Sequence, residues 1–137
     1  MNFEPIVMQY LASQGLFVSP QFSIRADRKE WSCPDFVALD FRKPEVQVIE
    51  VTIAYDVEGL IAKIRDREQQ WFEKLRAQLP LLGVPAKNWS YAVSAFVRRD
   101  RCERVRHEFS GAADVRVVAI EEIAFSWKWP WDEWAKA

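Results

Sequence analysis

Two acidic residues, Asp35 and Glu50, have the type and spacing that most directly suggest chemistry. They lie fifteen positions apart in the stretch Cys33–Thr52, CPDFVALDFRKPEVQVIEVT. This separation accommodates a strand, a tight connection and half of a second strand. It therefore predicts that the two carboxylates lie on adjacent strands and face the same space. Carboxylates held that close repel each other, and a divalent ion with oxygen ligands relieves the repulsion best.

The residues around the two acids predict the β-hairpin that would position them. Pro34 cannot donate a hydrogen bond to a neighbouring strand, so the first arm is expected to begin at Asp35, and it is almost continuously apolar as far as Phe41. The second arm, residues 46–53, is apolar on both faces. One face carries Val46, Val48, Glu50 and Thr52, and the other carries Ile49, Val51 and Ile53. Glu50 is thus expected inside a sheet, where an unpaired charge is expensive.

Pro34-Asp35 followed by Glu50-Val51-Thr52 resembles the PD-(D/E)XK nuclease superfamily, whose core carries Asp on one strand and (D/E)-X-K on the next. Upstream, Glu4 followed eleven residues later by Gly15 is similar to the first helix of small Holliday-junction resolvases. The resemblance covers about the first 100 residues. It implies an α/β, restriction-endonuclease-like core, a central mixed β-sheet flanked by helices, and DNA hydrolysis that depends on Mg²⁺ or Mn²⁺.

The resemblance also implies roles for individual residues. Asp35 and Glu50 would be metal ligands, with the Val51 carbonyl as a possible third oxygen and Glu4 as a further acid near the metal. Glu4 is equally explained as a favourable charge at the start of a helix.

The lysine position of the motif is occupied by Thr52, which can hydrogen-bond a water or a phosphate oxygen but brings no charge. Some members of the superfamily place this lysine on the following helix. Lys63 is accordingly the first choice for the missing cation and Arg65 the second. If neither reaches the site, the fold has lost its chemistry.

Composition sets limits on both fold and partners. A chain of 137 residues with half of them hydrophobic predicts one domain, residues 1–137, with a single core. The net charge of −1 gives no global basic field for nucleic acid. A local patch of Arg25, Arg28 and Lys29, with Arg65, would have to contact the phosphate backbone, although such cations also suit a solvated loop.

Cys33 and Cys102 fall in different predicted elements and lack metal-ligand spacing, so they are expected to be reduced thiols of a cytoplasmic protein. No apolar run is long enough for a spanning helix, and the N-terminus lacks a secretion signal, so no membrane association is expected. His107 is the only histidine, which argues against Ser-His or Cys-His catalysis.

Periodicity and breakers predict the remaining elements. A first helix, Glu4 to Ser13, is ended by Gly15. One continuous helix is expected from about Val57 to Leu79, stopped by Pro80. The other expected elements are a strand from Leu16 to Arg25, a charged connection from Asp27 to Ser32, a strand from Trp89 to Val97, a helix from Asp100 to Phe109 and a strand from Val115 to Ile120.

The end of the chain, residues 126–137, contains Trp127, Trp129, Trp131 and Trp134. Tryptophan buries a large area, so this tail is expected either to fold back over the sheet or to form a homodimer or protein interface. Two functions are consistent with the sequence. One is a Mg²⁺-dependent endonuclease acting on duplex or branched DNA. The other is a noncatalytic binding or assembly module of the nuclease fold that uses the tryptophan tail.

Overall fold

The computed structural model describes residues 2–126. In chain order, its helices and strands are α1 (Glu4–Ser13), β1 (Phe17–Pro20), β2 (Ile24–Ala26), β3 (Lys29–Ser32), β4 (Phe36–Asp40), β5 (Glu45–Val51), α2 (Glu58–Arg65), the π-helical turn η1 (Glu68–Phe72), α3 (Glu73–Leu81), β6 (Ser90–Val97), α4 (Arg99–Glu108), β7 (Val115–Ala119) and α5 (Ile120–Ser126). The tail residues Trp127, Trp129, Trp131 and Trp134, predicted to form an interface, lie outside the described residues.

A mixed five-stranded sheet in the order β1-β4-β5-β6-β7 forms the centre of the chain. Strand β4 pairs antiparallel with both β1 and β5, whereas β6 pairs in parallel with both β5 and β7 through helical crossovers. Strand β5 lies in the middle, which explains why its residues are apolar on both faces. The structure therefore confirms the predicted α/β class and the central mixed sheet flanked by helices.

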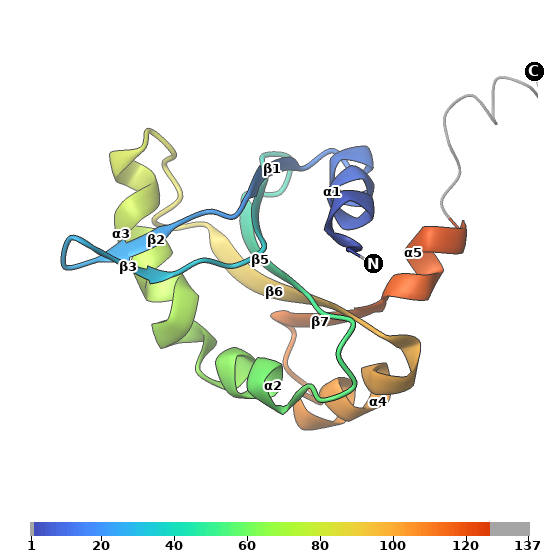
Figure 1. Cartoon of the computed structure of the whole chain (residues 1–137). Helices are drawn as coiled ribbons and strands as arrows, with labels where there is room; N and C mark the ends of the chain where they lie inside the picture. The colour runs from blue at the N-terminus through green and yellow to red at the C-terminus, as the bar shows by residue number, and fades with distance from the viewer. Residues whose placement is uncertain (1, 127–137) are drawn as a thin grey trace, which may run out of the picture.

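Helices cover both faces of the sheet, so there are two apolar cores (Figure 1). Val46 and Val48 point into the larger core, beneath α2, η1, α3 and α4. Ile49 points into the smaller core, beneath α1 and α5. This alternation confirms the two faces predicted for the second arm of the hairpin. Gly15, at φ +84°, follows α1 as predicted, in a conformation that favours glycine.

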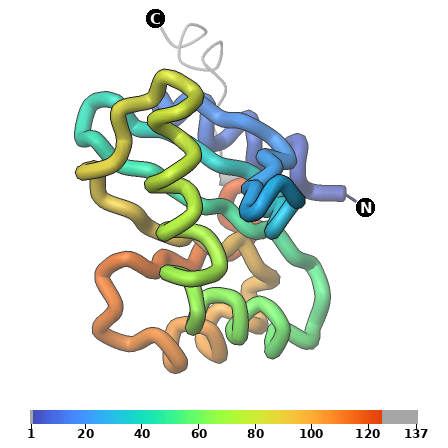
Figure 2. Tube along the Cα trace, turned by 90° about the vertical axis from the view of Figure 1, so that its left-hand side faces the viewer, coloured from blue at the N-terminus to red at the C-terminus, as the bar shows by residue number. Residues whose placement is uncertain are grey.

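The single helix predicted over residues 57–79 is wrong, because the segment is broken. Helix α2 ends at Arg65, η1 inserts a π-helical turn, and α3 continues in a different direction (Figure 2). The π turn places the adjacent Trp71 and Phe72 together in the core, at 0% and 3% exposure. Pro80 does not stop the helix either. It sits in the last turn of α3, where only a terminal hydrogen bond is lost.

The segment predicted as one strand followed by a charged loop is instead split into β1 and a separate hairpin, β2–β3. Asp27 and Arg28, both at positive φ, form the tight turn of this hairpin. The side chain of Gln78 on α3 holds the hairpin in place: its Oε1 accepts from Arg25 N at 2.9 Å and its Nε2 donates to Ser23 O at 3.0 Å. Because the turn contains no glycine, it could not be predicted from the sequence.

The final predicted strand is confirmed over Val115–Ala119, but Ile120 begins helix α5 rather than ending the strand. Ile120 and Ile123 of α5 complete the smaller core against α1. Among the helices of residues 2–126, none combines the length and apolarity that crossing a membrane would require.

Candidate functional site

Asp35 and Glu50 come together where β4 begins and β5 ends, two inner strands of the central sheet. Strand β4 begins directly after Asp35, and its first residue, Phe36, pairs with Ile49 of β5. One further step in the same antiparallel register places Asp35 opposite Glu50. The backbone N–H of Val51 donates to Asp35 Oδ2 at 2.7 Å, which fixes the aspartate side chain against β5. The hairpin thus positions the two acids as the sequence predicted.

Glu50 is partly buried, and no arginine of residues 2–126 forms an ion pair with it. The pKa of its carboxyl group is raised from the usual 4.5 to about 8, mainly by burial and next by the negative charge of Asp35, whereas the positive charge of Lys63 opposes the shift. A hydrogen bond with Asp35 and the charge of Glu4 make smaller contributions to the same increase. Near neutral pH this carboxyl group therefore holds a proton or needs a cation.

Glu45, at the other end of the same strand, shows how a buried carboxylate is stabilised structurally. Arg116 donates two hydrogen bonds to it, both at 2.8 Å, and these hold the pKa of Glu45 below its usual value. Strand β5 thus carries one acid with a full arginine partner and another, Glu50, whose nearest charged neighbours are mostly acids. Such a perturbed group at the carboxyl end of a strand is typical of a functional site.

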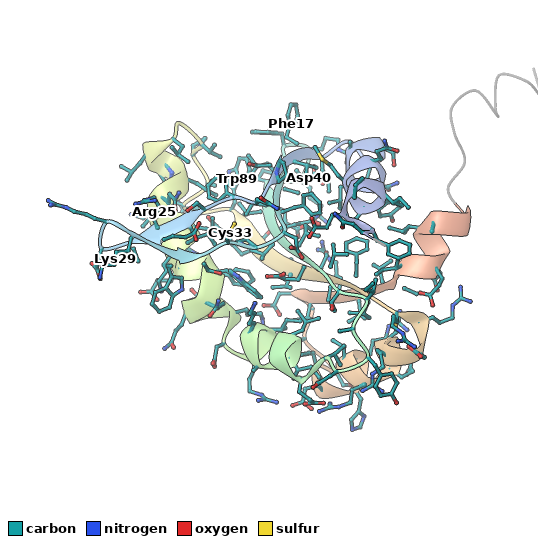
Figure 3. The ribbon with its side chains drawn as sticks, viewed as in Figure 1. Phe17, Arg25, Lys29, Cys33, Asp40 and Trp89 are labelled. Carbon is teal, nitrogen blue, oxygen red and sulfur yellow. The ribbon has the colours of Figure 1, made fainter. Side chains whose placement is uncertain are left out.

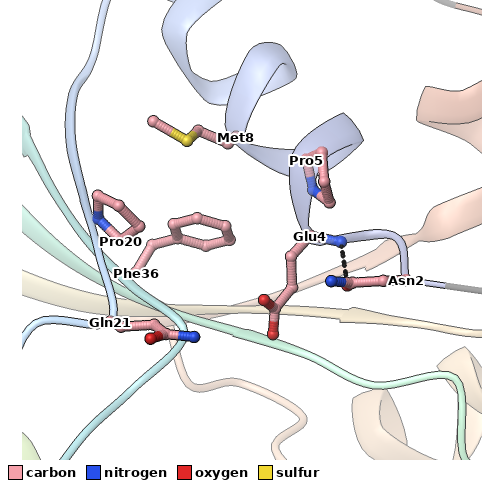
Figure 4. A pocket seen from close by; sticks show the side chains of 7 residues that line it. All are labelled: Asn2, Glu4, Pro5, Met8, Pro20, Gln21 and Phe36. Carbon is pink, nitrogen blue, oxygen red and sulfur yellow. Dashed lines mark hydrogen bonds between the residues drawn. The ribbon is translucent and has the colours of Figure 1, made fainter.

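Glu4 joins the two acids from the start of α1. A hydrogen bond with Asp35 raises the pKa of Glu4, and partial burial and the charge of Asp35 raise it further. Its carboxyl group projects from the helix toward the strands beside a cavity of about 270 Å³ (Figure 4). The cavity is lined by Asn2, Glu4, Pro5, Met8, Pro20, Gln21 and Phe36. The structure therefore brings together all three acids that the sequence analysis selected.

The donor set fits a hard divalent cation only in part. Within residues 2–126, no group of three or more His, Cys, Asp or Glu side chains is arranged so that it could hold a metal ion. Mg²⁺, however, is commonly bound by one or two carboxylates, with water and substrate phosphate completing its octahedron. Asp35 and Glu50 are the two carboxylates that could fill this role. Val51 donates its N–H to Asp35, and the role predicted for its carbonyl as a third oxygen stays a prediction.

Thr52, at the motif's lysine position, closes the turn that follows β5. Its Oγ1 accepts a hydrogen bond from the backbone N–H of Ala54 at 3.1 Å, and its own N–H donates to Phe96 O at 3.0 Å. The hydroxyl proton is still available for a water or a phosphate oxygen. Thr52 thus lies beside the acids but supplies no positive charge to them.

Lys63 and Arg65, the two cations predicted to replace the motif lysine, have different surroundings. Lys63 is exposed on α2. Its positive charge favours a lower pKa of Glu50, but the opposite effect of burial is larger. Arg65 donates to Glu108 on α4 at 2.5 Å and so joins α2 to α4. Lys63 is therefore the cation whose charge reaches the acids.

Replacing Lys63 by Met is expected to raise the pKa of Glu50, because the positive charge that opposes the effect of burial is lost. Carboxyl-carbon NMR measures this pKa directly. Lys63→Arg keeps the charge and should leave the pKa of Glu50 close to that of the parent, and Lys87→Met, at an exposed lysine in the loop before β6, serves as the control. A pKa of Glu50 unchanged by Lys63→Met would show that the charge of Lys63 does not reach the acids.

The predicted phosphate contacts Arg25, Arg28 and Lys29 lie on the exposed β2–β3 hairpin (Figure 3). Arg25 Nη2 donates to the Arg28 carbonyl at 2.9 Å, so this arginine partly stabilises its own hairpin. Both cysteines are free thiols, with Cys33 exposed and Cys102 buried. His107 is exposed on α4.

Two features of the segments that adjoin the acids were not selected from the sequence. Gln21 has a positive φ of 48°, uncommon for a residue with a side chain, and its N–H donates to the Asp35 carbonyl at 2.8 Å. Tyr55, in the loop after β5, has two arginines of the β6–α4 segment against its ring. Neither has a sequence signal, because each depends on segments brought together by the sheet.

No protein-family model matches the chain, and no curated protein matches it as a relative. The role of the acids is therefore inferred from their geometry and chemistry.

Proposed function

We propose that the chain is an endonuclease that hydrolyses DNA phosphodiester bonds and depends on Mg²⁺, which Mn²⁺ can replace. Its core would be PD-(D/E)XK-like, that is, restriction-endonuclease-like. The observation that carries the proposal is the convergence of Asp35 and Glu50 from adjacent antiparallel strands, with Glu4 beside them. The element order supports it as well: a helix precedes the acid-bearing hairpin, and a helical segment leads to a parallel strand.

The proposed chemistry assigns a role to each residue of the site. Asp35 and Glu50 would hold the divalent ion, which would lower the pKa of a water and withdraw charge from the phosphate. Val51 N–H orients Asp35 through its hydrogen bond. Lys63 provides positive charge on the α2 side, and Thr52 offers a hydroxyl to a water or a phosphate oxygen. Glu4, whose pKa is raised by its hydrogen bond with Asp35, borders the cavity beside the site.

A cleavage assay tests the proposal directly. Duplex, four-way branched and single-stranded DNA are incubated with the protein in Mg²⁺, Mn²⁺ or EDTA. Cleavage is expected in either metal and absent in EDTA, because the two carboxylates cannot polarise a phosphate without a cation. Isothermal titration calorimetry of the protein with Mn²⁺ measures metal binding separately. Absence of both cleavage and metal binding would reject the endonuclease.

The alternative is a noncatalytic module that kept the fold and binds a protein or nucleic acid. Thr52 in place of a lysine favours it, as does the lack of a three-ligand group among the described residues. The same calorimetry separates the two functions, because a noncatalytic module has no need for a cation at Asp35 and Glu50. A homodimer formed through the tryptophan tail belongs to this second proposal.

A further inference from the structure

Tyr55 is an exposed aromatic residue in the loop that joins β5 to α2. It is 61% exposed. The Arg101 guanidinium carbon lies 4.2 Å from the centre of its ring, and that of Arg98 lies 5.5 Å from it. Such distances are typical of cation–π contacts. Figure 1 shows this loop passing beside α4. Arg101 lies in the first turn of that helix, and Arg98 immediately precedes it.

The two arginines are held in position by different contacts. Arg98 donates to Asp100 through Nε at 3.0 Å and Nη2 at 2.6 Å, which fixes its guanidinium beside the helix start. Arg101 Nε is buried and has no hydrogen-bond partner in the part of the chain that the structure describes. Stacking on Tyr55 therefore orients the Arg101 guanidinium. The tyrosine ring is thus held against two guanidinium groups while most of the residue remains exposed.

The position of Tyr55 connects it to the acids. It follows the carboxyl end of β5, and Arg98 follows the carboxyl end of the parallel neighbour β6, the edge at which open α/β sheets bind ligands. Tyr55 lies five positions after Glu50, a span of no more than about 18 Å even if fully extended. A nucleotide near a phosphate bound at the acids therefore comes within reach of this ring.

We propose that Tyr55, supported by Arg98 and Arg101, is a stacking platform for an unstacked nucleobase close to the phosphate at which the strand is cut. The inference rests on the proposed function and specifies its substrate: DNA with unpaired nucleotides, either single-stranded or branched, in preference to continuous duplex. An exposed aromatic ring stacks with any base, and neighbouring guanidiniums attract the backbone, so such a platform tolerates different sequences.

Two other exposed aromatic sites suit this role less well. Trp31 donates its indole N–H to Gln70 O at 3.0 Å and carries Lys74 on its ring at 3.9 Å, contacts that fasten the β2–β3 hairpin to the helical segment. Phe17 packs against Phe41, with ring centres 5.2 Å apart, on the edge strand β1. Neither combines two arginines with the loop that follows Glu50.

The test measures binding in EDTA, where cleavage cannot interfere. A fluorescein-labelled single-stranded oligothymidine and a duplex of equal length are titrated with the protein, Tyr55→Ala, Tyr55→Phe and Phe17→Ala. We expect Tyr55→Ala to weaken single-strand binding by roughly 5- to 100-fold and Tyr55→Phe to change it by less than about 3-fold, because the ring is retained. Phe17→Ala, which removes a comparably exposed ring elsewhere, should bind as the parent does. Circular dichroism confirms that each variant is folded.

The outcomes separate this inference from the endonuclease itself. Single-strand binding that depends on Tyr55, without cleavage of any DNA, would support the platform and reject the endonuclease. Cleavage and binding unaffected by Tyr55→Ala would overturn the platform while the endonuclease stands. Equal binding of single strand and duplex by the parent, equal losses in Tyr55→Ala and Phe17→Ala, or no binding to either DNA, would also overturn it.

Discussion

Replacing Asp35 by Asn, or Glu50 by Gln, is expected to lower metal-dependent DNA cleavage by at least about 100-fold. Each change removes one of the two charges that would hold the cation, while the size and hydrogen-bonding shape of the side chain are nearly retained. In Asp35→Asn the amide oxygen can still accept the Val51 N–H, so the strand pairing should persist. Single-turnover cleavage of labelled branched DNA with saturating enzyme measures the effect on the chemical step.

Two control variants make this result specific. Glu73→Gln changes an exposed acid on α3 and should cleave DNA as the parent does. Glu45→Gln changes the other buried acid of β5, whose partner is Arg116, and should affect stability rather than chemistry. DNA binding in EDTA should remain close to the parent value in Asp35→Asn and Glu50→Gln. If Asp35→Asn and Glu50→Gln both cleave DNA as the parent does, these two acids do not carry the reaction.

The acid-bearing hairpin could be predicted from sequence because its signals are local. Pro34 sets the beginning of β4, and alternation in β5 assigns Val48 and Glu50 to one face and Ile49 to the other. A two-strand pairing between neighbouring segments then fixes which residues lie opposite each other. The positions of Asp35 and Glu50 follow from this register alone.

The break between α2 and α3 could not be predicted, because it depends on tertiary packing. The apolar residues of 57–79 fit one helical stripe, and only the sheet surface selects a π-helical turn that buries both Trp71 and Phe72. The β2–β3 turn was missed for a related reason. Arg28 adopts a positive φ that local preference disfavours, and the contacts of the hairpin with α3 compensate.

The surroundings of the acids depend on residues distant in sequence. Tyr55 and Arg98 are 43 positions apart, and they meet because β5 and β6 pair in parallel and end at the same edge. Glu4 could be selected as an acid at a helix start, but its contact with Asp35 requires α1 to pack across the edge of the hairpin. Residue type thus predicts the chemistry, whereas the sheet order decides which groups share the site.

Glu50→Gln is also expected to stabilise the protein at alkaline pH, by about 3 to 5 kcal/mol at pH 9. Burial, with the charge of Asp35, raises the pKa of Glu50 from its usual 4.5 to about 8 in the folded state. Between these two values the folded protein holds a proton that the unfolded chain has released. The parent therefore loses stability as the pH rises from about 4.5 to 8, and the loss stays constant above that range. Glutamine cannot ionise, so the variant lacks this loss.

Urea unfolding of the parent and Glu50→Gln in EDTA, at several pH values from 4 to 9, measures the difference. The two free energies of unfolding should nearly coincide at pH 4, where both states of the parent are protonated, and separate progressively to pH 8. Glu73→Gln should follow the parent throughout, because its carboxylate is exposed in both states. A constant difference at all pH values would show that packing, not the ionisation of Glu50, is responsible. If the expected separation occurs together with lost cleavage, the same carboxyl group that destabilises the fold is the one the reaction requires.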